Sequence, residues 1–310
     1  MRILPLLVLL LSGLAALGQQ KRVCFSFDDL PVVSYGITDT IYQKKLINKL
    51  VRSLCDSNIP AIGFVNEGKL YENEVIDRFQ VELLKDWVDN GLDLGNHTFS
   101  HPDYNSVAFK DYSEDILKGE TITKKILGRK GKSIRYFRHP FLHMGTSKIK
   151  ADSLSDFLLK KGYKVAPVTI DNDDYLFALA YKRAAVKKDT SLMTQIGQDY
   201  INYMEKKLNY FEKQANRLFG RDISQILLLH ASSINSDYID SLISTFKRNN
   251  YIFVNMDKAI EDKAYKTDIT VFGKWGISWL DRWALSQGKK RDFFIEDPVT
   301  PGYITKLAEE

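Results

Sequence analysis

The stretch Val23-Cys24-Phe25-Ser26-Phe27-Asp28-Asp29 decides the fold class that the sequence predicts. Its first five residues are mostly apolar and predict a buried β-strand that runs directly into two adjacent acids. Six further stretches of this kind follow, and helical patterns separate most of them. They are residues 61–65, 92–95, 134–138, 164–170, 225–230 and 251–254. Seven such strands indicate parallel βαβ units in a barrel or a large open sheet, and therefore an α/β protein.

The helices between the strands are predicted from apolar residues at helical spacing. They cover residues 39–57, 112–127, 147–161 and 237–249, and one more carries Val75, Ile76, Phe79, Leu83 and Leu84. A long helical insertion, residues 176–219, is predicted as two helices broken near 188–190. An outer helix that has grown longer is favoured for it over a mobile lid. In the tail, Trp275, Trp279 and Trp283 share one helical face, where packing is favoured over stacking on sugar rings.

Residues 1–18 have the features of a signal peptide, because an apolar stretch follows Arg2 and small residues precede the expected cleavage before Gln19. The stretch is shorter than the ~20 apolar residues of a spanning helix, and no later segment predicts a transmembrane anchor. The expected location is therefore secreted or periplasmic. Residues 19–263 are expected to form one catalytic domain, and residues 264–310 a Trp-bearing extension that packs on the barrel.

Composition excludes several other classes of protein. The chain of 310 residues has 44 Lys plus Arg against 39 Asp plus Glu, and this net charge of +5 is too scattered to predict nucleic-acid binding. Two cysteines exclude a disulfide-dense scaffold and an all-cysteine metal site. Cys24 and Cys55 are expected as buried apolar residues rather than as a disulfide. No protein partner can be inferred.

Polar residues that follow the strands are the candidate functional residues, because active sites of parallel α/β folds lie at the carboxyl ends of strands. Asp28 and Asp29 point to opposite sides if the first strand continues, so one can hold a metal while the other acts as a base. Helix capping or a turn is the alternative. His97 and His101, after the third strand, are expected to converge on one helical turn and share a divalent ion. Pro102 limits the length of that turn.

Two further strands end in residues suited to acid–base chemistry. Arg138 ends the fourth strand, where it is expected to pair with a catalytic carboxylate and lower the pKa of that group. His230 ends the sixth strand and is a candidate general acid. The sequence contains no G-x-S-x-G motif of a serine nucleophile, so no covalent intermediate is expected.

Taken in order, these residues resemble the motifs of the polysaccharide deacetylase family (the NodB homology domain, carbohydrate esterase family 4). The five motifs are Ser26-Phe27-Asp28-Asp29, His97-Thr98-Phe99-Ser100-His101, Arg138-His139-Pro140-Phe141, Asp171-Asn172-Asp173-Asp174-Tyr175 and Leu227-Leu228-Leu229-His230. Tyr175 stands where the family usually has Trp, and Phe141 where it often has Tyr. His139 and His143 have no role in the pattern, and packing or surface positions are favoured for both.

The resemblance implies a distorted (β/α)7 barrel, with the helical insertion before the last motif and the C-terminal extension added to it. It implies metal-dependent removal of acetyl groups from the N-acetylated sugars of a chitin- or peptidoglycan-like glycan, which is the expected partner. Asp29, His97 and His101 would hold the divalent metal ion, most often Zn2+ in this family.

The resemblance also implies the catalytic roles. Asp28, tethered by Arg138, would take the proton from the attacking water. The backbone N–H of Phe141 would face the oxyanion. His230, oriented by Asp174, would protonate the leaving amine. An amide needs all of these groups, because it is a poor electrophile with a poor leaving group.

Several alternatives remain open. An O-acetyl esterase acting on acetylated xylan-like glycans would use the same site. A catalytically silent carbohydrate-binding protein would be expected to lack the base or a metal ligand. Amidases of the family that act on small non-sugar rings often lack the metal-ligand pattern. In this sequence the base and all three metal-ligand positions are present. An iron oxygenase with two histidines and one carboxylate would leave Asp28, Arg138 and His230 unexplained.

Overall fold

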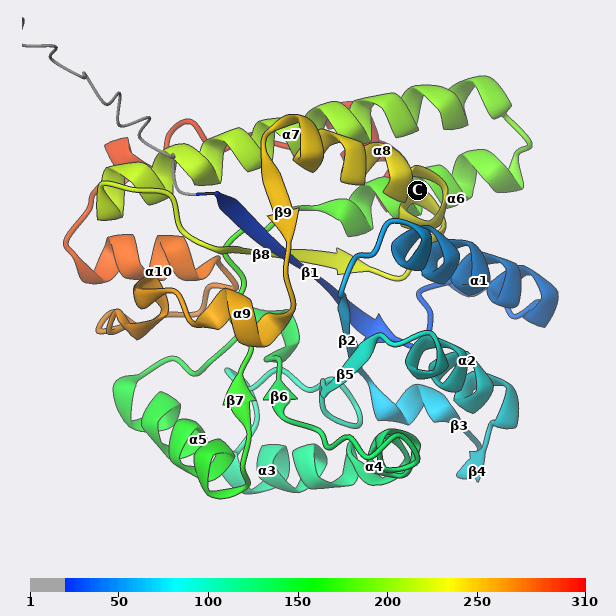
Figure 1. Ribbon diagram of the computed structural model, residues 1–310, viewed down its shortest axis with the longest axis horizontal. Helices are drawn as coiled ribbons and strands as arrows, with labels where there is room; N and C mark the ends of the chain where they lie inside the picture. The colour runs from blue at the N-terminus through cyan, green and yellow to red at the C-terminus, as the bar shows by residue number, and fades with distance from the viewer. Residues whose placement is uncertain (1–19) are drawn as a thin grey trace, which may run out of the picture.

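The computed structural model describes residues 20–310, which contain a seven-stranded parallel sheet (Figure 1). The strands are β1 (Lys21–Leu30), β2 (Ile62–Val65), β5 (Asp93–Asn96), β6 (Tyr136–Phe137), β7 (Lys164–Val165), β8 (Gln225–His230) and β9 (Tyr251–Phe253). Their order is β7-β6-β5-β2-β1-β8, and β9 pairs with the start of β1. All seven correspond to strands predicted from the sequence. The two-stranded antiparallel pair β3 (Tyr71–Glu72) and β4 (Val75–Ile76) lies outside this sheet.

The sheet curls into a distorted barrel through the segment after β7. The prediction of a strand over residues 164–170 is too long, because β7 ends at Val165. The chain then crosses to β8, where Ile170 forms an isolated parallel bridge with Leu227. The N–H of Ile170 donates to the carbonyl of Ile226 at 3.0 Å. This crossing joins the two sides of the curled sheet, so the expected (β/α)-barrel class is confirmed in its distorted form.

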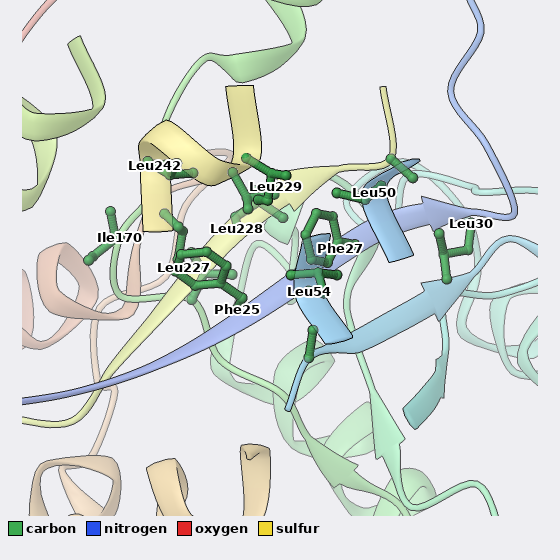
Figure 2. Close-up of a cluster of buried hydrophobic side chains, with 14 of the residues drawn as sticks. Phe25, Phe27, Leu30, Leu50, Leu54, Ile170, Leu227, Leu228, Leu229 and Leu242 are labelled. Carbon is green, nitrogen blue, oxygen red and sulfur yellow. The ribbon is translucent and has the colours of Figure 1, made fainter. Parts of the chain in front are cut away.

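The main core lies between the sheet and the helices α1 (Thr40–Asp56) and α8 (Ser233–Arg248) (Figure 2). Phe25 and Phe27 of β1 pack there with Leu227 and Leu229 of β8, and all four side chains are fully buried. Cys24 points to the opposite face and packs in a second cluster. A strand covered on both faces needs apolar residues at successive positions, which explains the near-continuous apolar stretch in the sequence.

The remaining helices surround the sheet. They are α2 (Arg78–Asp89), α3 (Phe109–Lys118), α4 (Thr121–Gly128), α5 (Lys148–Lys160), α6 (Asp174–Val186), α7 (Thr190–Phe219), α9 (Met256–Ile260), α10 (Trp279–Ser286) and α11 (Gly302–Glu309). Cys24 and Cys55 are both free, and Cys24 is buried as expected, whereas Cys55 is only partly buried. In the described part of the chain, no helix combines the length and the apolar character needed to cross a membrane. The predicted signal peptide, residues 1–18, lies outside the described residues.

Two predicted helices are wrong in their extent. Val75 and Ile76 belong to β4 and are exposed, and the helix begins only after Asp77, whose carboxylate caps it by accepting the N–H of Phe79 at 2.8 Å. The predicted helix 112–127 is two helices, α3 and α4, interrupted at Gly119 and Glu120. A Cβ on Gly119 would lie 2.4 Å from the Thr98 carbonyl carbon. The helix therefore breaks at the point where the chain passes close to the loop after β5.

The insertion forms two helices, α6 and α7, with the break at residues 187–189 as predicted. The long helix α7 crosses the top of Figure 1 and packs on α6 and α8. One face of it is buried, including Tyr200, Leu208 and Phe211. The favoured interpretation, an extended outer helix, is therefore confirmed.

The C-terminal extension, residues 264–310, packs on the barrel, but its tryptophans do not share one helical face. Trp275 precedes α10 and is 44% exposed, whereas Trp279 and Trp283 lie within α10 and are buried. The N–H of Trp279 donates to the carbonyl of Val168 at 2.7 Å. Packing is therefore the role of two of the three indoles.

Candidate active site and metal centre

A cleft of about 600 Å³ lies at the carboxyl ends of the central strands and contains most of the predicted site residues. Those that line it are Asp28, Asp29, His97, His101, Phe141 and His230. Arg138 and Asp174 are fully buried, and each is hydrogen bonded to a residue of the cleft. The fold thus brings together side chains from β1, β8 and the loops after β5 and β6.

Asp29, His97 and His101 form a group that fits a metal ion, with one ligand atom of each within 4.8 Å of the others. Asp29 Oδ1 is 3.6 Å from His101 Nε2 and 3.9 Å from His97 Nε2, and it is buried without a hydrogen-bond donor. The Nδ1 of His97 lies 2.8 Å from the carbonyl of Arg138, so it carries the proton and leaves Nε2 free as a ligand. A buried carboxylate oxygen beside two bare imidazole nitrogens suits a divalent cation.

The backbone around these ligands differs from the predicted geometry. Residues 97–101 form an irregular loop and not a helical turn, because Thr98 (φ 67°) and His101 (φ 56°) are left-handed. Asp28 and Asp29 do not point to opposite sides: a carboxylate oxygen of each lies 3.9 Å from His97 Nε2. Asp29 is itself left-handed (φ 63°), and the pairing of β1 with β2 shifts register there. This irregularity turns both carboxylates into the cleft.

Electrostatics favour the protonation states that a metal site needs. Burial lowers the pKa values of His97 and His101 to about 4, so both imidazoles are neutral at pH 7. Burial alone would raise the pKa of Asp29, but the ammonium of Lys69 and the two imidazoles hold it below its ordinary value. Lys69 Nζ also donates to the Asp29 carbonyl at 2.8 Å. Sequence reasoning missed Lys69, which follows β2 and carries no motif.

Asp28 is held by Arg138, as the resemblance implied. Arg138 Nη1 lies 3.1 Å from Asp28 Oδ1, and its Nη2 and Nε donate to Ser26 Oγ and the Ala166 carbonyl. Arg138 lowers the pKa of this carboxylate, as expected, but it does not set the direction of the net shift. Burial raises the pKa of Asp28 above its ordinary value, and the Arg138 guanidinium offsets only part of that rise.

His230 is the end of a buried hydrogen-bonded chain. Its Nδ1 lies 2.7 Å from Asp174 Oδ1, and Asn235 Nδ2 donates to Asp174 Oδ2 at 2.7 Å. Tyr200 of α7 donates in turn to Asn235 Oδ1 at 2.5 Å. Burial opposes the charged imidazole, but the carboxylates of Asp174, Asp29 and Asp28 together outweigh it and raise the pKa of His230 to about 9. Sequence reasoning missed Asn235 and Tyr200, which lie outside the five motifs.

The loop after β6 forms one wall of the cleft and is held by the C-terminal extension. Phe141 (φ 55°) and Leu142 (φ 54°) are both left-handed, and the Phe141 ring is 54% exposed. Arg282 Nη2 donates to the carbonyls of Leu142 and Trp275 at 2.8 and 2.9 Å. Gly276 packs directly on the loop, since a Cβ there would lie 2.1 Å from the Phe141 carbonyl oxygen.

The two histidines without a role in the motifs differ from each other. His139 is buried and its ring stacks on Trp279, so packing is the role that the structure gives it. His143 lines the cleft and is not part of the metal-ligand group.

Comparison with known proteins gives one family match. Residues 17–156 match the family model described as polysaccharide deacetylase. This part of the chain is similar to a polysaccharide deacetylase domain. The matched part of the domain includes Asp28, Asp29, His97, His101, Arg138 and Phe141, whereas Asp174 and His230 follow it along the chain.

Individual relatives of the deacetylase domain are distant. An uncharacterized 30.6 kDa protein of Geobacillus stearothermophilus is 25% identical over 234 residues, which are 75% of this chain and 72% of that protein. The chitin deacetylase of the fungal pathogen Colletotrichum lindemuthianum is 19% identical, with a TM-score of 0.51 over 78% of this chain and 88% of that one. The peptidoglycan deacetylase PdaC of Bacillus subtilis is 18% identical, with a TM-score of 0.48 over 78% and 91%. At these identities the likeness to the chitin deacetylase establishes the fold.

Proposed function

We propose that this protein is a secreted, metal-dependent hydrolase that removes acetyl groups from the N-acetylated sugars of a chitin- or peptidoglycan-like glycan. The observation that carries the proposal is the arrangement of three functional groups in one cleft. Asp29, His97 and His101 could share a cation, Asp28 is held beside them by a buried arginine, and His230 lines the same cleft. Export is proposed from the sequence of residues 1–18 alone.

The metal ligands would be Asp29, His97 and His101, and zinc is the ion proposed for them. When bound, such an ion polarises a carbonyl group and lowers the pKa of water from ~15.7 to about 7. With three protein ligands the site keeps positions open for water and substrate, as catalytic zinc sites do.

The other residues would handle the protons and the developing charge. Asp28 accepts the proton of the attacking water, while Arg138 fixes the position of its carboxylate. The backbone N–H of Phe141, on the wall of the cleft, donates to the oxyanion, where one such donor is worth roughly 2.7–4 kcal/mol of barrier. His230 gives its proton to the leaving amine, and Asp174 orients it by holding Nδ1.

The test is acetate release by the purified protein. Zinc-loaded protein should release acetate from chitin oligomers or peptidoglycan fragments, and a chelator should stop the release. Asp28→Asn should abolish it. Release from acetylated xylan alone would replace the proposal with an O-acetyl esterase, and unchanged release by the Asp28→Asn variant would remove the mechanism.

A further inference from the structure

His143 lines the cleft but has no part in the mechanism above. Its Nδ1 lies 2.6 Å from Asp103 Oδ1, so the carboxylate takes this side of the ring. Within residues 20–310 no group is hydrogen bonded to Nε2, and Nε2 is not among the buried polar atoms that lack a partner. The free nitrogen of a partly buried imidazole therefore reaches the solvent of the cleft.

The ring of His143 is fixed from two sides. Asp103 holds one edge, and Gly276 of the C-terminal extension packs on the other, since a Cβ there would lie 3.4 Å from His143 Cδ2. An imidazole held in this way keeps Nε2 in one direction, and little rotamer freedom remains to be lost when a ligand binds.

His143 lies beyond the metal-ligand group along the wall of the cleft. The centroid of the Phe141 ring is 4.5 Å from that of the His101 ring and 5.8 Å from that of the His143 ring. Phe141 is more than half exposed and offers an apolar face on which a sugar ring can stack. A glycan that has one sugar at the metal-ligand group and the next sugar stacked on Phe141 would bring that second sugar towards His143.

We propose that His143, oriented by Asp103, is a specificity-determining residue whose Nε2 hydrogen-bonds a hydroxyl group of the sugar next to the acetylated one. This inference rests on the proposed function. With its proton on Nδ1, the imidazole accepts a hydroxyl proton at Nε2. A sugar hydroxyl is both donor and acceptor, so the contact is kept if the ring is protonated. The position selects oligomers over single sugars.

Two isosteric substitutions separate this role from simple packing. The amide of His143→Asn occupies the place of Nδ1 and keeps the contact with Asp103, while the longer His143→Gln places its amide near Nε2. His143→Asn should raise KM for an acetylated tetramer by about 3- to 10-fold, the effect of one hydrogen bond, and leave KM for a single acetylated sugar unchanged. His143→Gln should recover part of the tetramer affinity. A purely structural pair with Asp103 predicts the reverse order, and that order would overturn the proposal.

A binding measurement makes the test independent of turnover. Asp28→Asn and the double variant Asp28→Asn/His143→Asn are titrated with chitin tetramer by calorimetry, after both are shown to unfold cooperatively. The double variant should bind about 3- to 10-fold more weakly. Equal affinities, or no binding by either protein, overturn the role of His143. If the parent protein releases no acetate from any glycan, the proposed function fails, while the calorimetric difference still measures the sugar contact.

Discussion

Replacing Gly276 with alanine should slow the reaction without unfolding the protein. Gly276 has no left-handed backbone, so alanine is allowed there and the effect is purely steric. Its new Cβ would lie 2.1 Å from the Phe141 carbonyl oxygen, and ordinary contacts begin at 3.4 Å, so the two segments must separate by about 1.3 Å. Because the contact atom is backbone, no side chain can rotate away. Displacements of about 1 Å in an active site cost on the order of 100-fold in rate.

The assay compares kcat for acetate release with the free energy of unfolding in urea. Gly276→Ala should lower kcat roughly 100-fold and stability by about 1–3 kcal/mol, the usual range for overpacking. Gly302→Ala is the matched control, because nothing lies within 4 Å of its Cβ, and it should change stability by no more than about 0.5 kcal/mol. Parental kcat in Gly276→Ala would refute the view that the C-terminal extension positions the Phe141 loop.

Three further outcomes are expected. Asp174→Asn removes a carboxylate that helps to raise the pKa of His230 to about 9 against the effect of burial. Activity that needs protonated His230 should therefore fall off at a lower pH than in the parent. If kcat declines at the same alkaline pH in both proteins, this expectation is contradicted. Arg138→Met leaves the buried Asp28 carboxylate unpaired and should lower the free energy of unfolding in urea by about 3–5 kcal/mol at pH 7. The loss should be smaller in acid, where Asp28 is protonated. An equal loss of stability at every pH would argue against the ion pair. His101→Ala should abolish the rise in Tm that zinc produces in the parent, measured without substrate; an equal rise would remove His101 from the metal site.

The strands could be predicted from the sequence because their apolar residues record burial on both faces, as at Phe25 and Phe27. The helix errors have a different origin. Val75 and Ile76 match helical spacing with the residues that follow, but they are exposed on a short antiparallel pair, so spacing alone was misleading. The break at Gly119 depends on contact with the loop after β5, some twenty residues earlier, and local sequence carries no trace of that contact.

The site could be predicted only as far as its motifs reach. Motif spacing identifies side chains that carry chemistry, but the groups that support them lie elsewhere in the chain. Lys69 holds Asp29 from the segment after β2, Asn235 holds Asp174 from α8, and Arg282 holds Leu142 from α10. Each is a single polar residue whose neighbours in the sequence do not distinguish it from other polar residues of the chain. Only the folded chain shows which of the many lysines, asparagines and arginines is brought to the site.

Two of the proposed metal ligands have a left-handed backbone that the surrounding contacts must hold in place. Asp29 and His101 both adopt φ near +60°, a conformation that costs a non-glycine residue on the order of 1–3 kcal/mol. Glycine would remove the strain but also the side chain proposed as a ligand, so the strain at these two positions cannot be relieved without losing the proposed ligand. Thr98 shares the conformation and is not one of the proposed ligands. Its hydroxyl accepts the N–H of His101 at 3.0 Å, and its own N–H donates to Asn96 Oδ1 at 2.7 Å. Glycine at position 98 would remove the strain there, but it would also remove the hydroxyl that holds the N–H of His101. The hydrogen bonds of the loop, and not backbone preference, therefore determine the direction of the His101 imidazole.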